Sequence, residues 1–208
     1  MKLTARVLKA LGAMLVLISC TAGAGHAADL SQAVTLVATA RLAGSIYDET
    51  VLVAAPLPQG QHIGFILNRP TRVKLETLFP GHAPSRKVVD PVSLGGPMLP
   101  GMIVALTRRA PLNRKTPLNS GAVIPLMSGL VALLDGDSVD RVIETTPNDA
   151  RYFAGLVIWA PGELDEEIRS GAWNVRPASV ETVFRANPAG LWKELSAGGR
   201  WIQVRLER

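Results

Sequence analysis

The stretch RYFAGLVIWAPGELDEEIRSGAW, residues 151–173, joins the most continuous apolar run of the chain to a group of carboxylates. An apolar run of this length, closed by Pro161-Gly162, is typical of a strand that is buried on both faces. We therefore expect residues 151–160 to form the central strand of a sheet. The carboxylates behind it raise the question of whether they form a catalytic acid and base. They are Glu163, Asp165, Glu166 and Glu167.

These carboxylates fit the opening turn of a helix better than a reaction. Acidic side chains near a helix N-terminus complement its partial positive charge, and each contributes about 0.3–1 kcal/mol. Leu164 and Ile168 are four residues apart and would share the buried face of that helix, so the carboxylates point elsewhere. Because acid–base catalysis needs a carboxyl group in an apolar or charge-coupled setting, we interpret the acidic run as structural.

The segments on either side of this stretch predict a mixed α+β fold. Short apolar runs rich in β-branched residues and bounded by Gly, Pro or Asn indicate strands. They occur from Thr35, at Thr50–Pro56, at His62–Pro70, at Met102–Leu106 and in AVIPLMSGLVALL, which breaks near Ser128-Gly129. Helices are expected at 73–79, after a cap at Asp137 or Ser138, at the acidic run, and as two short helices before a strand-like tail, RWIQVRLER. Without a regular βαβ rhythm, this order favours a bent mixed sheet or partial barrel over a doubly wound fold.

The amino-terminal segment has the pattern of a secretory signal. Lys2, Arg6 and Lys9 precede an apolar run, Ala10 to Ser19, and small residues follow it. Two cleavage sites are open. LISC, ending at Cys20, resembles a lipobox, which would leave a lipid-anchored chain after a signal of residues 1–19. GHA, ending at Ala27, suits ordinary signal peptidase, which would remove residues 1–27 and release the protein into the periplasm. No linker divides the remainder, so residues 33–208 are expected to form one domain.

Cysteine and charge exclude several classes of function. Cys20 is the only cysteine of the 208 residues, so the folded domain is expected to hold no disulfide and no thiol active site. The chain carries 22 basic and 17 acidic residues, and without the three basic residues of the signal the balance is 19 to 17. The nearest basic patch, Arg108, Arg109, Arg114 and Lys115, has no aromatic residues to stack on bases. We expect no nucleic-acid partner for an exported chain, and membrane contact only through a lipid anchor.

Catalytic motifs are missing from the sequence. GAGHAA, residues 23–28, matches a dinucleotide fingerprint in letters only, because no strand precedes it. His26, His62 and His82 are scattered and predict no metal site. There is no nucleophile elbow and no phosphate loop, so no cofactor is expected. The leading interpretation is a binding or accessory protein. The alternative is a hydrolase-type enzyme that uses Asp48, Ser128 and one histidine.

Three backbone features mark a candidate binding surface. LNRPT places Asn68 and Arg69 at the end of a strand, and LGGP can hold Gly95 and Gly96 at positive φ with their amides turned toward a ligand. Trp159 ends the predicted central strand. Because ligand-reading loops gather at strand ends, we expect Arg69, Gly95 and Trp159 to line one cleft. Its occupant would be a small anionic ligand or a protein partner.

Four blocks in order resemble the YqgE/AlgH family. They are ARLAGSIYDETVLV (40–53), GFILNRPT (64–71), SLGGPM (93–98) and LVIWAPGELDEEIRSGAW (156–173). The resemblance implies a single compact α+β domain, whose strongly bent mixed β-sheet forms a pseudo-barrel with surrounding helices. It implies an association with transcriptional regulation but names no catalytic residue. Family members ordinarily begin near the first block, so the export signal is a departure from the family pattern.

Overall fold

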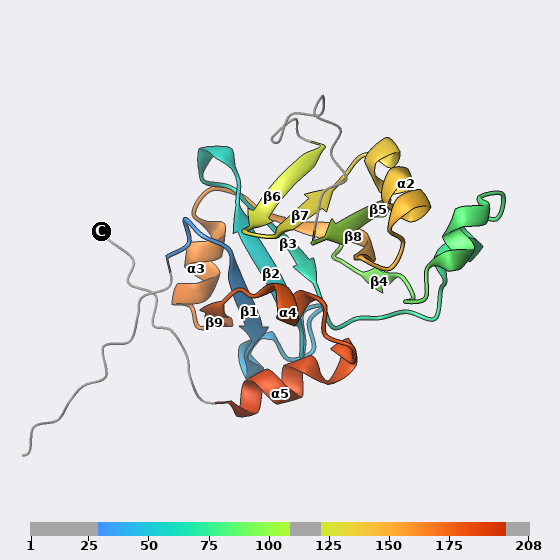
Figure 1. Ribbon diagram of the computed structural model, residues 1–208. Coiled ribbons are helices and arrows are strands. Elements are labelled where there is room, and N and C mark those ends of the chain that lie inside the picture. The colour runs from blue at the N-terminus through green and yellow to red at the C-terminus, as the bar shows by residue number, and fades with distance from the viewer. Residues whose placement is uncertain (1–28, 109–121, 199–208) are drawn as a thin grey trace, which may run out of the picture.

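The computed structural model describes residues 29–108 and 122–198 of the chain (Figure 1). The predicted signal segment with Cys20 lies outside the described residues. So do Arg109, Arg114 and Lys115 of the basic loop and the predicted carboxy-terminal strand. Within the described residues, none of the helices combines the length and the apolar character that crossing a bilayer requires.

One nine-stranded sheet organises the domain. Its strands are β1 (Val34–Ala38), β2 (Val51–Pro56), β3 (His62–Ile66), β4 (Ser93–Leu94), β5 (Met98–Thr107), β6 (Val123–Met127), β7 (Leu130–Leu133), β8 (Ala150–Trp159) and β9 (Trp173–Pro177). The order is β6-β7-β5-β8-β3-β2-β1-β9, and β4 pairs with β8 beside this path. The β4–β8 pair is parallel and the other pairs are antiparallel, so the sheet is mixed. The expected central strand is confirmed, since β8 pairs with β3, β4 and β5.

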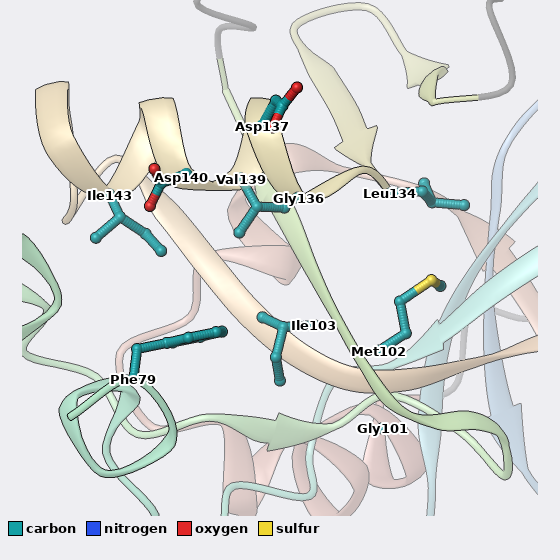
Figure 2. A pocket seen from close by; sticks show the side chains of 10 residues that line it. All are labelled: Phe79, Gly101, Met102, Ile103, Leu134, Gly136, Asp137, Val139, Asp140 and Ile143. Atoms are coloured by element: carbon teal, nitrogen blue, oxygen red, sulfur yellow. The ribbon is translucent and has the colours of Figure 1, made fainter. Parts of the chain in front are cut away.

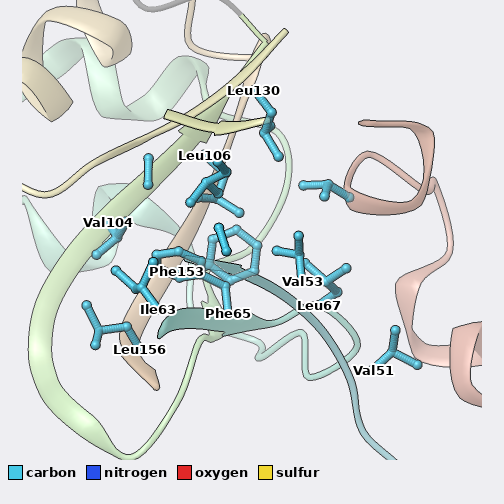
Figure 3. Packing of buried hydrophobic residues seen from close by; sticks show 14 of the residues in the cluster. Val51, Val53, Ile63, Phe65, Leu67, Val104, Leu106, Leu130, Phe153 and Leu156 are labelled. Carbon is cyan, nitrogen blue, oxygen red and sulfur yellow. The ribbon is translucent and has the colours of Figure 1, made fainter. Parts of the chain in front are cut away.

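The sheet curls into a half-barrel around an apolar interior. β2 and β6 lie far apart in the strand order, yet they contact each other across the interior. Buried side chains from both halves of the sheet fill the space between them, with Val53 and Phe65 facing Leu106 and Phe153 (Figure 3). The Phe65 and Phe153 ring centroids are 6.1 Å apart. This curled sheet confirms the predicted fold class.

Helices cover the sheet on both sides. They are α1 (Leu75–Leu78), α2 (Gly136–Thr145), α3 (Glu163–Arg169), α4 (Val180–Val183) and α5 (Leu191–Ala197), with 3₁₀ turns η1 (Ala40–Leu42), η2 (Pro58–Gly60), η3 (Ala83–Lys87) and η4 (Pro188–Gly190). α4 and α5 contribute Val183 and Leu191 to the interior core. α3 packs on the outer face of the β1–β2 half, and α2 packs on the outer face of the β5–β7 half. In Figure 1, α1 and η3 stand at the outer edge beyond α2.

Two local predictions differ from the structure. The cap of α2 is Asp135, not Asp137 or Ser138, because the Asp135 carboxylate accepts a hydrogen bond from the Ser138 amide at 2.9 Å. β9 was not predicted, yet it forms the edge of the sheet beside β1. The buried face of α3 is confirmed, since Leu164 and Ile168 are both buried.

Candidate functional site

Asn68 fixes the chain at the end of β3 next to the start of β2. Its side-chain oxygen accepts a hydrogen bond from the Val51 amide, and its side-chain nitrogen donates to the Glu49 carbonyl, both at 2.8 Å. The side chain is buried, and each of its two polar atoms makes one of these contacts. Asn68 therefore fixes the backbone that forms the surface here.

Glu49 has an unusual backbone conformation at this point. Its φ is +51°, a region that side chains other than glycine rarely adopt. The bond from Asn68 to the Glu49 carbonyl holds the turn in place, and the Arg69 guanidinium donates to the neighbouring Asp48 carbonyl. Backbone strain of this kind persists only where surrounding contacts impose it, and it concentrates at binding sites.

A cleft opens between this turn and the carboxy-terminal helix. We call it the Arg69 cleft, and it has a volume of about 490 Å³. Its lining residues are Glu49, Asn68, Arg69, Pro70, Ala189, Gly190, Trp192 and Lys193. Arg69 and Lys193 are exposed cations and Glu49 is an exposed anion, so the lining carries a net positive charge of one.

Trp192 gives the Arg69 cleft a fixed aromatic wall. Its indole nitrogen donates to the Ala38 carbonyl at 2.9 Å, which ties α5 to the end of β1. The ring also packs against both the interior core and the outer core around α3. In Figure 1, α5 crosses the end of the sheet where β1 finishes.

Gly95 and Gly96 do not line the Arg69 cleft, and their predicted conformation is wrong. Neither has a positive φ, and the Gly95 amide donates to the Ala154 carbonyl at 2.8 Å. The glycines are needed for close packing. A Cβ at Gly95 would collide with the Gly155 carbonyl, and one at Gly96 with the Leu156 carbonyl. The loop still adjoins Arg69 through the backbone, because the Leu94 amide donates to the Arg69 carbonyl.

Trp159 is a core residue, which corrects the expectation of a cleft shared with Arg69 and Gly95. Its side chain is 2% exposed, and its ring lies against Gly64, where a Cβ would come within 2.6 Å of it. The ring packs in the outer core with Leu164 and Trp173. A residue buried in this way cannot line a surface cleft.

The acidic run serves the structure, in one respect beyond helix capping. Glu163 Oε2 accepts a hydrogen bond from the Ala160 amide at 2.8 Å, which closes the turn into α3. Glu167 Oε2 accepts from two indoles, Trp159 Nε1 at 3.0 Å and Trp173 Nε1 at 2.6 Å. One carboxylate thereby joins the ends of β8 and β9 to α3.

The hydrolase constellation does not assemble. Asp48 accepts a hydrogen bond from the Gly44 amide and lies near the end of β3 that is opposite His62. The His62 ring contacts the Leu30 carbonyl. His82 lies beside Asp140 of α2, and Ser128 is exposed in the turn between β6 and β7. Because strands rise about 3.3 Å per residue, Asp48 and His62 are separated by the length of a whole strand.

The Arg69 cleft contains residues that the sequence pattern did not single out. Glu49 reaches Arg69 through the pairing of β2 with β3, whereas Trp192 and Lys193 come from α5, which packs beside β1. Asn68 and Arg69 both line this cleft, and ligand binding there stays a prediction.

Comparison with known proteins gives matches along most of the chain. The family model described as AlgH-like matches residues 35–199. A UPF0301 protein of Thermobifida fusca is 32% identical over 168 residues, which cover 77% of this chain and 82% of that protein. A UPF0301 protein of Streptomyces avermitilis is 29% identical over 162 residues, with 77% and 82% covered.

Two solved structures share the fold. The solution structure of the AlgH protein from Pseudomonas aeruginosa superposes with a TM-score of 0.62 at 21% identity, covering 82% of this chain and 88% of that one. The crystal structure of a protein from Corynebacterium diphtheriae gives a TM-score of 0.63 at 21% identity, with 82% and 87% covered. At this identity the likeness concerns the fold alone.

Proposed function

The chain belongs to the AlgH-like family, for which no catalytic function is indicated, and from this premise we propose that it is an exported binding or accessory protein. The Arg69 cleft would be its binding site, and a small anionic molecule its ligand. The observation that carries this proposal is that Arg69 and Lys193 face one cleft beside the fixed Trp192 ring.

The charges of the Arg69 cleft favour an anion that also carries a hydrogen-bond donor. A guanidinium and an ammonium group suit a carboxylate or a phosphate, and charge-assisted hydrogen bonds are about twice as strong as neutral ones. Arg69 uses one nitrogen on the Asp48 carbonyl, which holds the guanidinium in place and leaves further donors. Glu49 at the rim would accept a hydrogen bond from a hydroxyl or amine of the same ligand.

Export is supported by the sequence pattern of the amino-terminal segment. Its basic residues precede an uninterrupted apolar run and small residues follow, as in a secretory signal. An exported protein of this family would act in the envelope, on a periplasmic solute or on another envelope protein. The cleft, with a volume of about 490 Å³, has the size of a small-molecule site.

Titration of the purified protein with pyrophosphate and with citrate, followed by isothermal calorimetry and by the Trp192 indole signal in NMR spectra, tests the proposal. We expect at least one of the two anions to bind and to shift the Trp192 signal. Arg69→Ala should weaken that binding by about 10-fold or more, because a hydrogen bond to a charged group contributes about 1.5–3 kcal/mol.

Arg86→Ala is the matched control, since Arg86 is an exposed arginine of η3 outside the Arg69 cleft. Its affinity should equal that of the wild type. Equal weakening by both variants would reveal a nonspecific charge effect. Failure of both anions to bind, or unchanged binding by Arg69→Ala, would overturn the assignment of the cleft.

A further inference from the structure

Residues 75–92, which we call the outer arm, contain α1 and η3 and pack against α2. This half of the sheet has its own outer core, beneath α2, which is separate from the one around α3. Leu75, Val88 and Val92 of the arm bury their side chains in it. At one end of the arm, Asn148 accepts a hydrogen bond from the Val89 amide at 3.0 Å and donates to the Lys87 carbonyl at 3.1 Å. The middle of the arm carries a different contact, between a histidine and two acids.

His82 of the arm meets Asp140 and Glu144 of α2. The two acids are four residues apart and therefore lie on one face of the helix. One ligand-type atom from each of the three side chains lies within 4.8 Å of the other two. His82 Nε2 is 3.2 Å from Asp140 Oδ1. The sequence predicted no metal site because its histidines are scattered. His82 is close to these acids only in the folded chain.

Within the part of the chain that the structure describes, His82 Nε2 lacks a hydrogen bond, which distinguishes this cluster from a hydrogen-bonded histidine–aspartate pair. Nε2 is buried, and among the described residues it makes no hydrogen bond, although the carboxylate of Asp140 is beside it. Its separation from Asp140 Oδ1 is close to the distance between two ligands of a tetrahedral zinc ion, which is roughly 3.3 Å for metal–ligand bonds of about 2.0–2.1 Å. Exposed Glu144 can turn toward the same point at little cost.

We propose that His82, Asp140 and Glu144 form a binding site for a divalent transition-metal ion, with Zn²⁺ as the ion that fits best. The imidazole nitrogen is a borderline ligand and the two carboxylates are hard ligands, and Zn²⁺ binds both types in proteins. The ion links the middle of the arm to α2, whereas Asn148 holds the arm near Lys87 and Val89. Three protein ligands leave a fourth position for water or for an anionic group of a ligand.

A groove lies beside the cluster, next to the fourth coordination position of the ion. Its volume is about 460 Å³, and Phe79, Ile103, Val139 and Ile143 provide apolar walls around Asp140 (Figure 2). Phe79 comes from the end of α1, Ile103 from β5 and the others from α2. Asp140 therefore belongs both to the metal cluster and to the groove. A molecule with an anionic head and an apolar body could bind the ion and the groove together.

Equilibrium dialysis of the EDTA-treated protein against Zn²⁺ tests the metal site directly. We expect one Zn²⁺ ion per chain at saturation. His82→Gln should reduce the affinity by about 100-fold or more, and Glu144→Gln by at least about 10-fold, because each removes a ligand of the ion. At the same Zn²⁺ concentration, the thermal unfolding midpoint should rise markedly for the wild type and much less for His82→Gln.

His62→Gln and Glu181→Gln are matched controls that should bind Zn²⁺ as the wild type does. His62 is the other histidine of the described domain and contacts the Leu30 carbonyl, and Glu181 is an exposed acid of α4. Circular dichroism in EDTA checks that every variant is folded. Absence of stoichiometric binding by the wild type, or full affinity in folded His82→Gln, would overturn the proposal and leave the cluster as an ion pair.

Discussion

Glu167 is the residue whose role exceeds what its position in the sequence suggests. Its carboxylate accepts hydrogen bonds from the indoles of Trp159 and Trp173, which are 2% and 3% exposed. Glu167→Ala would leave two buried donors without this partner, at about 1–3 kcal/mol each. We expect a loss of about 2–6 kcal/mol of unfolding free energy, measured by urea denaturation with tryptophan fluorescence.

Glu166→Gln is the natural comparison, because Glu166 lies beside Glu167 on α3 and is exposed. Removing its charge from the first turn should cost only about 0.3–1 kcal/mol. If both substitutions cost the same, the carboxylates would act through helix electrostatics alone and the indole contacts would contribute nothing. Neither substitution should alter anion binding in the Arg69 cleft at temperatures where the variant is folded.

Tyr47 should lower the free energy of unfolding as the pH rises into the alkaline range. Burial, and then the negative charges of Glu167 and Glu163, raise the pKa of Tyr47 above its ordinary value of 10.0. The unfolded chain therefore ionises this tyrosine first as the pH rises. The stabilisation is fully present below pH 10 and is lost as the pH climbs toward the pKa of the folded state. Burial raises the pKa of Tyr152 as well, so the wild type should lose stability from both residues.

Tyr47→Phe isolates the first of these two contributions. We expect the wild-type urea midpoint to fall more steeply between about pH 9 and pH 11 than that of the variant. The edge-on packing against Trp173, with ring centroids 5.7 Å apart, is retained by phenylalanine. Superimposable pH profiles for the two proteins would show that the Tyr47 hydroxyl titrates equally in the folded and unfolded states.

At the scale of elements, the 95–96 loop crosses β8 at a close backbone approach. Gly155 has a φ of +72°, and a Cβ there would come within 2.5 Å of the Gly96 carbonyl and 2.7 Å of the Met98 carbonyl. Gly96→Ala puts a methyl group into the β8 backbone, which cannot move without disturbing the central strand. We expect it to cost about 3 kcal/mol or more, or to prevent folding.

Gly101→Ala serves as the control on the neighbouring strand. Gly101 lies in β5 with an ordinary φ, and a Cβ there meets nothing within 4 Å. Its unfolding free energy should change by no more than about 0.5 kcal/mol. A similar small effect of Gly96→Ala would mean that the loop shifts freely, contrary to its hydrogen bonds with β3 and β8.

The sequence predicted the elements well where a pattern was strong. The apolar run of β8 and the spacing of Leu164 and Ile168 express burial directly, and both predictions are confirmed. β9 was missed because WNVRP is short and mixes polar with apolar residues, as suits an edge strand. Gly95 and Gly96 of LGGP were predicted to have a positive φ, but they are needed for close packing against β8. In the sequence, a glycine required by close packing cannot be told from a glycine required by a turn.

At the scale of the whole molecule, both proposed sites combine segments that are distant in the sequence. Arg69 was predictable from the strand end that carries it, but Trp192 and Lys193 reach it only because α5 crosses the sheet beside β1. His82 meets α2 only because the outer arm folds back on that helix. Periodicity reports which face of an element is buried, and it contains no information about which elements become neighbours across a sheet.

The last prediction concerns where the whole molecule resides. Lys2, Arg6 and Lys9 precede the apolar run Ala10 to Ser19, so a fusion of residues 1–30 to alkaline phosphatase, which is active only outside the cytoplasm, should be active. Lys substitutions at two positions of the apolar run should abolish that activity, because they interrupt the segment that the export machinery reads. An inactive fusion that accumulates in the cytoplasm would refute export.

Cys20→Ala in the full chain then separates the two cleavage routes. A single lipidated cysteine would hold the protein on the membrane, so the variant should be released into the soluble periplasmic fraction if LISC is the site that is cut. If cutting occurs after Ala27, wild type and variant should both be soluble, since Cys20 is then removed with the signal. Mass spectrometry of the mature amino terminus assigns the route. A Cys20→Ala chain that stays on the membrane with its signal uncut would contradict cutting after Ala27, because that route does not need Cys20.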